Sequence, residues 1–485
     1  MKSNKILLIT VFLLFSYLII RFIDHGHLLF QFPFDFTNDL SSHIAKVVFL
    51  SEYGFHHIVP YWYNGYELFK FYPPAWFYFT LPIYELIGNS QISTYLSLGL
   101  IYVIGLVFFL ILGKMHKFSK LESIFYFLFF LASPIAIGNF IKLGRLPELF
   151  GWLMFIPFAG LILWYKDNKI DKKIWLLVIV YSIMLLSHQT TFIIASVLLI
   201  CLFLVKNYKE RIILIGASII TAVLTSFWWY PFIRDIKQSS ILEPTFSNRL
   251  FLWEGLLAEN ILSLLIPLAF IFMFYFYWKS LKKSKKELIF FFPLLIIAVL
   301  FLFRLIAFIP GLNILYPDVY HHFFIFMILY LYLKTNFPLR LSKIFHVAIV
   351  PISIIMILAS IFMTPWFVEN SQLDEDIISL LPAVEGKFVM YGITESYGKA
   401  YYSYAPVYYN LSTPAGWSHN EKSTEYLESF KEMGKAFREG SCEELKLKMK
   451  ELDTKTIITS DEFCVNSCEL DKTKEKGRAC LLVIN

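Results

Sequence analysis

Eleven apolar runs limit how this chain of 485 residues can fold. A membrane-spanning helix needs about 20 mostly apolar residues, so the shorter runs must extend into the aromatic sequence beside them. Charged residues make up only 16% of the chain, against roughly 25% in a soluble domain. We therefore expect an all-α polytopic membrane protein with about eleven transmembrane helices. The runs are Ile6–Phe22, Thr94–Leu112, Ile124–Ile137, Leu149–Trp164, Ile174–Leu186, Thr191–Val205, Ile212–Tyr230, Ile261–Trp278, Leu288–Phe303, Val319–Leu333 and Val347–Met363.

The loops between these runs alternate in charge, and one alternating set is strongly basic. Because short loops rich in Lys and Arg stay in the cytoplasm, we expect an integral plasma-membrane protein with its N-terminus inside and its C-terminus outside. The first run lacks a small-residue cleavage site, which indicates an uncleaved anchor. The net charge of +6 then reflects topology and does not point to a nucleic-acid partner. The basic loops carry Lys2 and Lys5; Lys114, Lys117 and Lys120; Lys166 to Lys173; Lys206 to Arg211; Lys279 to Lys286; and Lys334 to Lys343.

Two segments lack the character of membrane spans. The first is a long, aromatic outer loop over residues 23–93, within a transmembrane domain expected to cover residues 1–364. The second is the polar tail, residues 365–485, which is long enough to bury a modest core of its own. Its pattern predicts a small α/β extracytoplasmic domain, with helices at Glu425–Phe437 and Glu443–Leu452 and a strand at Thr456–Thr459.

Four of the five cysteines fall in this tail, at Cys442, Cys464, Cys468 and Cys480. An even number of cysteines in an extracytoplasmic domain favours disulfides. A zinc site is the alternative, although the Cys464–Cys468 spacing is not that of a standard zinc knuckle, and the pairing stays open. The same tail carries a glycosylation sequon at Asn410, a pattern that is also common by chance.

The start of the outer loop has the sharpest local signal. Thr37 or Asn38 can cap a helix that has Asp39 in its first turn. Asp39 and His43 are then four residues apart and share one face. This arrangement suits a carboxylate base with a histidine that orients it, binds an anion or shares a metal. The alternative is a helix-capping Asp and a solvated His.

Further along the outer loop, Glu67 stands between aromatic blocks that Gly65 and the Pro73–Pro74 pair interrupt. Aromatic faces with a few fixed polar groups suit sugar rings and isoprenoid chains alike. A hydrophobic re-entrant segment is the alternative, and it leaves Glu67 unexplained.

Cations recur at the predicted outer ends of other spans. Arg145 suits bidentate phosphate binding, although it could instead pair with Glu148 or contact lipid headgroups. Arg234 could likewise pair with Asp235. Arg304 has apolar neighbours on both sides, which favours a functional role near the membrane. The candidate phosphate ligands are Arg145, Arg304, Lys142, Arg234 and His188.

Several common signatures are absent from the sequence. It has no Walker A loop, no G-x-S-x-G, no H-E-x-x-H and no G-x-G-x-x-G, which argues against an ATP-driven pump and common soluble chemistries. Charged residues at mid-span are also lacking, which weakens a proton-coupled transporter.

Three short motifs of the outer loops carry a likeness to known proteins: Asn38-Asp39-Leu40-Ser41-Ser42-His43, Gly65-Tyr66-Glu67-Leu68-Phe69-Lys70-Phe71-Tyr72-Pro73-Pro74 and Gly144-Arg145-Leu146-Pro147-Glu148. With them and its architecture, the chain resembles the GT-C superfamily of membrane glycosyltransferases. More narrowly, it resembles the prokaryotic integral membrane proteins called 6-pyruvoyl-tetrahydropterin-synthase-related. The sequence departs from GT-C patterns because Leu40, not a second acid, follows Asp39, and no Trp-Trp-Asp motif is present.

The resemblance implies inverting transfer of a sugar from a polyprenyl-phosphate donor to an acceptor hydroxyl at the outer membrane face. Asp39 would be the general base, and His43 and Glu67 would orient it or hold the sugar. Arg145 and Arg304 would bind the donor phosphate, helped by Lys142, Arg234 and His188. The acceptor could be a glycan, a lipid or a protein, with membrane lipids as further partners. No metal ligand is assigned, and a divalent metal is left open.

Two other functions remain open. A flippase or transporter of lipid-linked sugars would need polar residues at mid-depth and on the inner side. A non-catalytic membrane scaffold would bind a partner through its outer domain, and Asp39 would then be dispensable.

Overall fold

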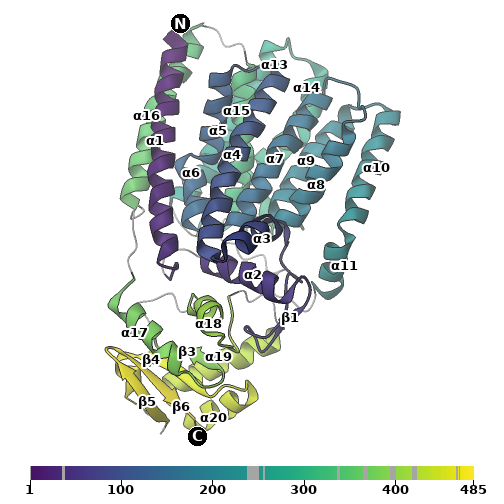
Figure 1. The fold of residues 1–485 in the computed structure, drawn as a ribbon. Helices are drawn as coiled ribbons and strands as arrows, with labels where there is room; N and C mark the ends of the chain where they lie inside the picture. Colours follow the sequence, from purple (N-terminus) through teal and green to yellow (C-terminus); the bar gives the residue numbers. More distant parts are fainter. Residues whose placement is uncertain are drawn as a thin grey trace.

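The protein is a bundle of long helices with a smaller domain at one end, and its N-terminus lies at the opposite end (Figure 1). The computed structural model describes residues 2–34, 39–236, 251–254, 257–335, 339–363, 370–393, 400–417, 423–465, 468 and 470–484. The eleven apolar runs lie largely in helices, with breaks at Ala132–Ser133 and at Thr225. After the first break the chain continues in α6 (Pro134–Ala136) and a π-helical turn (Ile137–Lys142). The helices are α1 (Lys2–Phe30), α4 (Ser90–His116), α5 (Lys120–Leu131), α7 (Leu146–Tyr165), α8 (Ile174–Ser187), α9 (Gln189–Val205), α10 (Tyr208–Leu224), α13 (Leu257–Ser280), α14 (Lys285–Leu302), α15 (Pro317–Lys334) and α16 (Leu339–Met363).

Fewer of these helices meet the length and apolarity needed for a span than the sequence predicts. Within the described residues, five can cross a membrane, or six if a bent pair counts as one span. The bent pair corrects the predicted span Ile212–Tyr230: α10 ends at Leu224, and α11 (Ser226–Asp235) leaves it at 75°. The Thr225 hydroxyl donates to the Thr221 carbonyl, 2.7 Å away, a back-bond that often bends helices.

Helix α1 is longer than its apolar run, so the first loop begins after Phe30 and not at residue 23. The extra length holds a buried ion pair in which the Arg21 guanidinium lies 2.9 Å from Asp24. Charged residues therefore do occur inside a candidate span, although not at its middle, where the sequence predicts none. The pair lies near the end of the helix where the first loop starts.

The first loop folds into its own small structure between the bundle and the C-terminal domain (Figure 1). Helix α2 (Leu40–Tyr53) leads to a short hairpin of β1 (Ile58–Val59) and β2 (Tyr66–Glu67), followed by α3 (Ala75–Ile87). Gly65 ends the hairpin turn at φ +102°, a conformation that favours glycine. Pro73 and Pro74 precede α3, where a missing backbone N–H is harmless.

The C-terminal domain has the predicted α/β character. Helices α19 and α20 and strand β4 fall where the sequence places them. The sheet runs in the order β3-β4-β6-β5, with β3 parallel to β4 and the other pairs antiparallel. The elements are α17 (Gln372–Leu380), β3 (Phe388–Met390), α18 (Tyr401–Tyr409), α19 (Thr424–Glu439), α20 (Cys442–Glu451), β4 (Thr456–Ser460), β5 (Asp471–Lys476) and β6 (Ala479–Val483).

Two disulfides tie this domain together. Cys442 pairs with Cys468, and Cys464 pairs with Cys480. The disulfide prediction is confirmed, and the zinc alternative is wrong because all four thiols are used. The sequon residue Asn410 ends α18 and accepts a hydrogen bond from the Tyr61 hydroxyl at 2.5 Å, at the contact between this domain and the first loop.

Candidate active site at the Asp39 end of the bundle

A close backbone contact brings the first loop against the turn before α7. Gly144 has φ +66°, and a Cβ on it would lie 2.6 Å from the Leu40 Cβ. Only glycine fits both the conformation and the space. The Asp39 backbone N–H donates to the Leu143 carbonyl at 3.3 Å. The start of α2 and the turn before α7 are thereby held together, although more than 100 positions separate them in the sequence.

Arg145 is the centre of the charges gathered there. Its Nη1 contacts the Asp318 carboxylate and lies 3.8 Å from Glu148, and its guanidinium lies 5.3 Å from the centre of the Tyr316 ring. Burial alone would lower the pKa of Arg145, but the carboxylates of Asp318, Glu148 and Asp39 raise it above its ordinary value. We call Asp39, Arg145, Glu148 and Asp318 the Asp39 cluster.

Asp39 does not occupy the position expected from the sequence. Helix α2 begins at Leu40, so Asp39 is the N-cap residue and not part of the first turn, and its side chain makes no capping bond. The predicted caps, Thr37 and Asn38, lie outside the described residues. The half-buried carboxylate instead accepts a hydrogen bond from the Trp417 indole at 3.0 Å.

Glu148 and His188 form the deeper part of the site. Glu148 is buried in the first turn of α7 and accepts a 3.3 Å hydrogen bond from the Trp152 indole. His188 lies at the junction of α8 and α9, and its Nδ1 is 2.7 Å from the Thr190 hydroxyl. Burial, and then Arg145, lower the pKa of His188 to about 3, although Asp318 acts in the opposite direction. His188 is therefore a neutral hydrogen-bonding group at neutral pH.

His43 is buried, which excludes the solvated histidine of the alternative interpretation. Its ring lies 5.6–5.8 Å from the rings of Tyr72, Trp76 and Phe77. Burial first, and then Lys46 and His188, lower the pKa of His43 well below its usual range. The Lys46 ammonium lies 4.7 Å from the centre of the Tyr72 ring, so a second cation is close to the cluster.

Glu67 and Arg234 belong to a different group of charges. Glu67 lies 3.6 Å from Lys70 and 3.7 Å from His56. Lys70 also lies 2.8 Å from Asp235, which pairs with Arg234 at the same distance. The sequence alternative of an Arg234–Asp235 pair is thus present. This group joins the first-loop hairpin to α11.

Lys142 and Arg304 lie in neither group: Lys142 interacts with α1, and Arg304 contacts α13. Lys142 interacts electrostatically with the Arg21–Asp24 pair of α1. Arg304 donates to Asn260 of α13 at 2.9 Å and stacks on Trp253, with its guanidinium carbon 3.3 Å from the ring centre. Of the candidate residues, the structure therefore brings together Asp39, Arg145 and His188, with His43 beside His188.

Three members of the site were not selected as site residues from the sequence. Glu148 was considered only as an ion-pair partner of Arg145, and that pair is present. Asp318 follows Pro317 at the start of α15, where both residues are ordinary helix-terminus chemistry. Trp417 lies 378 positions from Asp39, and no local pattern marks it. Among the described residues, no group of three or more His, Cys, Asp or Glu side chains is arranged to hold a metal ion.

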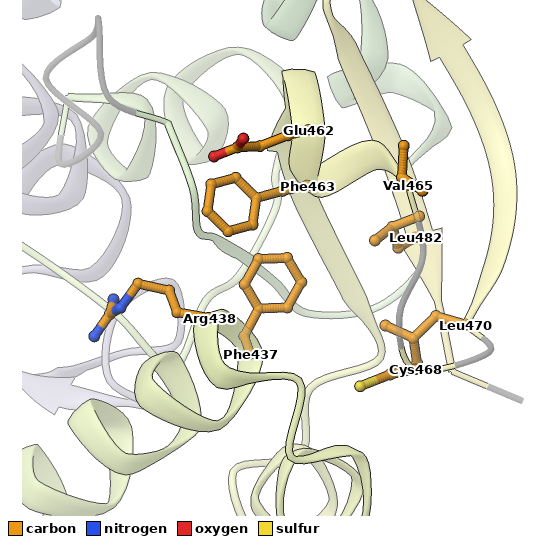
Figure 2. A pocket seen from close by; sticks show the side chains of 8 residues that line it. All are labelled: Phe437, Arg438, Glu462, Phe463, Val465, Cys468, Leu470 and Leu482. Atoms are coloured by element: carbon orange, nitrogen blue, oxygen red, sulfur yellow. The ribbon is translucent and has the colours of Figure 1, made fainter.

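A separate concavity lies on the C-terminal domain, with a volume of about 210 Å³. Figure 2 shows the Phe437 and Phe463 rings beside each other, with Arg438 and Glu462 at their edge. The two ring centres are 5.8 Å apart. Its lining comes from α19, β6 and the disulfide-linked loop, so it shares no residue with the Asp39 cluster.

Comparison with known proteins establishes the fold. The chain aligns with the arabinofuranosyltransferase AftD from Mycobacteria at 11% identity and a TM-score of 0.60, over 97% of this chain and 40% of AftD. It aligns with the oligosaccharyltransferase AglB from Archaeoglobus fulgidus at 11% identity and a TM-score of 0.53, over 92% of this chain and 69% of AglB. The AglB structure contains an inhibitory peptide and a dolichol-phosphate. The chain thus has the fold of GT-C membrane glycosyltransferases.

The sequence comparisons add no family. No protein-family model matches the chain, and no curated protein matches it. The resemblance to the 6-pyruvoyl-tetrahydropterin-synthase-related proteins is therefore not shown. The chain spans only 40% of the length of AftD, and identities near 11% support the fold alone.

Proposed function

We propose that this protein is a membrane glycosyltransferase that moves a sugar from a polyprenyl-phosphate donor to an acceptor hydroxyl with inversion. The observation that carries the proposal is the meeting of Asp39 and Arg145 at one end of the bundle. A carboxylate and a guanidinium in one place supply the two groups that such a transfer needs, in a fold that AftD and AglB share.

Asp39 is the proposed general base. The acceptor oxygen bonds to the anomeric carbon as the bond from that carbon to the phosphate oxygen breaks. The hydroxyl proton passes to the Asp39 carboxylate, and the electron pair leaves with the lipid phosphate. His188 is neutral, so in this scheme it contributes a hydrogen bond and not a charge.

Arg145 is the proposed phosphate ligand. Both of its ion pairs use Nη1, which leaves the rest of the guanidinium fork for phosphate oxygens. Its burial strengthens the attraction to the negative charge that develops on the leaving group. Lys142, Arg234 and Arg304 remain proposed as further cations along the path of the donor, and His43 and Glu67 remain proposed as groups that orient the base or hold the sugar.

The proposal is tested with purified protein in liposomes. The donors are radiolabelled dolichyl-phosphoryl mannose, dolichyl-phosphoryl glucose and decaprenyl-phosphoryl arabinofuranose, each with and without added oligosaccharide. We expect one of them to release polyprenyl phosphate and transfer its sugar, with Asp39→Asn inactive. Movement of intact donor across the bilayer without cleavage would support the flippase alternative. If no donor is cleaved or moved, the scaffold alternative holds.

We also propose that the Asp39 end faces the outside of the plasma membrane. A single cysteine introduced at Asn89, beside the first loop, should react in intact cells with a membrane-impermeant maleimide. A cysteine at Ser284, at the opposite end of the bundle, should react only after permeabilisation. The reverse labelling would place the Asp39 cluster in the cytoplasm and remove the polyprenyl-phosphate sugar of the outer leaflet as donor.

A further inference from the structure

We propose that Trp417, supplied by the C-terminal domain, is the positioning residue for Asp39. In this proposal the indole N–H holds carboxylate Oδ1, and Oδ2 is the oxygen that takes the acceptor proton. The proposal rests on the proposed role of Asp39 as base. It adds a residue from a separate domain to the catalytic machinery.

The contact has the geometry of a charge-assisted hydrogen bond. The Trp417 Nε1 lies 3.0 Å from Asp39 Oδ1, and only 7% of Trp417 is exposed. Asp39 stands at the N-cap of α2, where an Asp usually bonds to its own helix, yet it makes no such bond. Within the described residues, the Asp39 carboxylate thus receives its side-chain hydrogen bond from Trp417 of the C-terminal domain.

The segment that carries Trp417 is seated firmly against the first loop. Tyr63 donates its backbone N–H to the Ala415 carbonyl at 2.9 Å, and Thr413 donates to the Tyr61 carbonyl at 2.8 Å. Gly416 lies flat on the Tyr63 ring, where a Cβ would come within 2.4 Å of ring atoms. Strand-like pairing up to Ala415, two residues before Trp417, limits where the indole can point.

Further side-chain hydrogen bonds outside this pairing hold the two parts together. The buried Trp62 indole donates to the Tyr402 carbonyl at 2.5 Å, and the exposed Asn64 amide donates to the Leu452 carbonyl at 2.8 Å. The C-terminal domain therefore cannot shift from the first loop without losing several hydrogen bonds. We infer that the Asp39 carboxylate is ordered for catalysis only when this domain is docked.

A donor to the ionised carboxylate has two measurable effects. It stabilises the ionised form of the base, so its loss moves the acid limb of the pH–rate profile to higher pH. It also fixes the carboxylate orientation, so its loss lowers kcat. A tryptophan that merely fills space would produce neither effect when replaced by phenylalanine, beyond a general loss of stability.

The test compares Trp417→Phe with Tyr61→Phe, using the most reactive donor of the liposome panel. Trp417→Phe should lower kcat by about 10- to 100-fold, the worth of a hydrogen bond to a charged group. It should also move the acid limb of the pH profile up by about one pH unit. Tyr61→Phe removes the bond to Asn410 at the same contact without touching Asp39, so its acid limb should not move.

Two kinetic outcomes would overturn the inference. One is a Trp417→Phe enzyme with the wild-type pH profile. The other is an equal shift of the acid limb in both variants, which would show that loosening the contact is enough.

A fluorescence measurement tests the Trp417–Asp39 contact without any donor, so this inference and the proposed function can fail independently. The fluorescence of Trp417, taken as wild type minus Trp417→Phe, should change with pH and lose that change in Asp39→Asn. If no donor reacts with the wild-type protein, the proposed function fails. A Trp417 signal that is the same in Asp39→Asn would then overturn the inference on its own.

Discussion

Helix α7 has a cation at each end, and the two cations are stabilised very differently. Lys166 follows the C-terminus, where the helix dipole favours positive charge. Its ammonium lies 2.5 Å from Glu287 and 3.2 Å from the Tyr277 hydroxyl. Arg145 precedes the N-terminus, where the dipole opposes a cation. It is held there by carboxylates that come from outside its own turn as well as from within it.

The charges around the two cations also balance differently. At the Lys166 end, ion pairs join Lys166 and Lys286 to Glu287 and Asp167, and Lys334 also interacts with these charges. At the other end, within the described residues, the carboxylates of Asp318, Glu148 and Asp39 all interact with the Arg145 guanidinium. The first arrangement is explained by folding. The second places a guanidinium where the dipole of α7 opposes it, and local departures of this kind concentrate at functional sites.

The largest expected effect comes from Asp39→Asn, which tests whether the Arg145 end of α7 serves the reaction. The change keeps the shape and an acceptor for Trp417, but it removes the base. Turnover of the reactive donor should fall by about 10²- to 10⁴-fold, the usual contribution of a general base. The melting temperature should move by less than about 2 °C, since no packing is lost. Turnover that stays within about threefold of wild type would show that Asp39 is not the base.

Glu287→Gln should show the opposite pattern, with lost stability and retained chemistry. Removing one partner leaves Lys166 buried beside an uncharged amide, which typically costs about 3–5 kcal/mol. Thermal unfolding in detergent should report the loss, while kcat per folded molecule stays at the wild-type value. The double variant Lys166→Met, Glu287→Leu is the control and should regain stability. A large fall in kcat would mean that both ends of α7 serve the reaction.

The contrast between local and long-range interactions explains which parts of the structure the sequence could predict. Apolar periodicity located the helices of all eleven runs, and polar periodicity located α19, α20 and β4, because local patterns determine such elements. The break at Thr225 was missed because Thr225 and Ser226 are small polar residues that do not interrupt the apolar character of the run Ile212–Tyr230. There the Trp228 indole donates to the carbonyls of Phe69 and Tyr72 and holds α11 against the first loop, a contact across more than 150 positions.

The residues of the candidate site likewise fall into those that local sequence could predict and those that depend on distant contacts. Asp39 and Arg145 stand out locally, because each is a charge at the end of a predicted helix. Asp318 looks like an ordinary helix start, and Trp417 looks like part of a polar tail. Their roles depend on which distant segments come together, and no spacing within one segment encodes that.

Arg145→Lys tests the cation at the N-terminal end of α7, and we expect a smaller loss of activity than in Asp39→Asn. A lysine keeps the charge beside Asp318 and Glu148 but cannot offer a planar fork to phosphate. We expect kcat/KM for the donor to fall by about 10- to 100-fold, as for loss of a hydrogen bond to a charged group. Binding of dolichyl phosphate to the purified protein should weaken in parallel. The reference is Lys286→Arg, a change of cation at the opposite end, which should leave both measurements unchanged. Unaltered dolichyl phosphate binding in Arg145→Lys would count against Arg145 as the phosphate ligand.

The smallest predicted effect concerns pH and the Asp39 end alone. His188 is neutral in the folded protein because burial lowers its pKa to about 3, against 6.5 when it is exposed. Between pH 6.5 and pH 3 the imidazole is protonated in the unfolded chain but not in the folded protein. The free energy of unfolding therefore falls as the pH drops below 6.5. At pH 5 this amounts to about 2 kcal/mol for one histidine. Wild-type protein should therefore lose stability between pH 7.5 and pH 5, and His188→Asn should lose about 2 kcal/mol less. The matched control is His27→Asn, which removes an exposed imidazole from α1. An equal loss in wild type and His188→Asn would show that His188 is protonated in the folded protein, and it would then add positive charge to the Asp39 cluster.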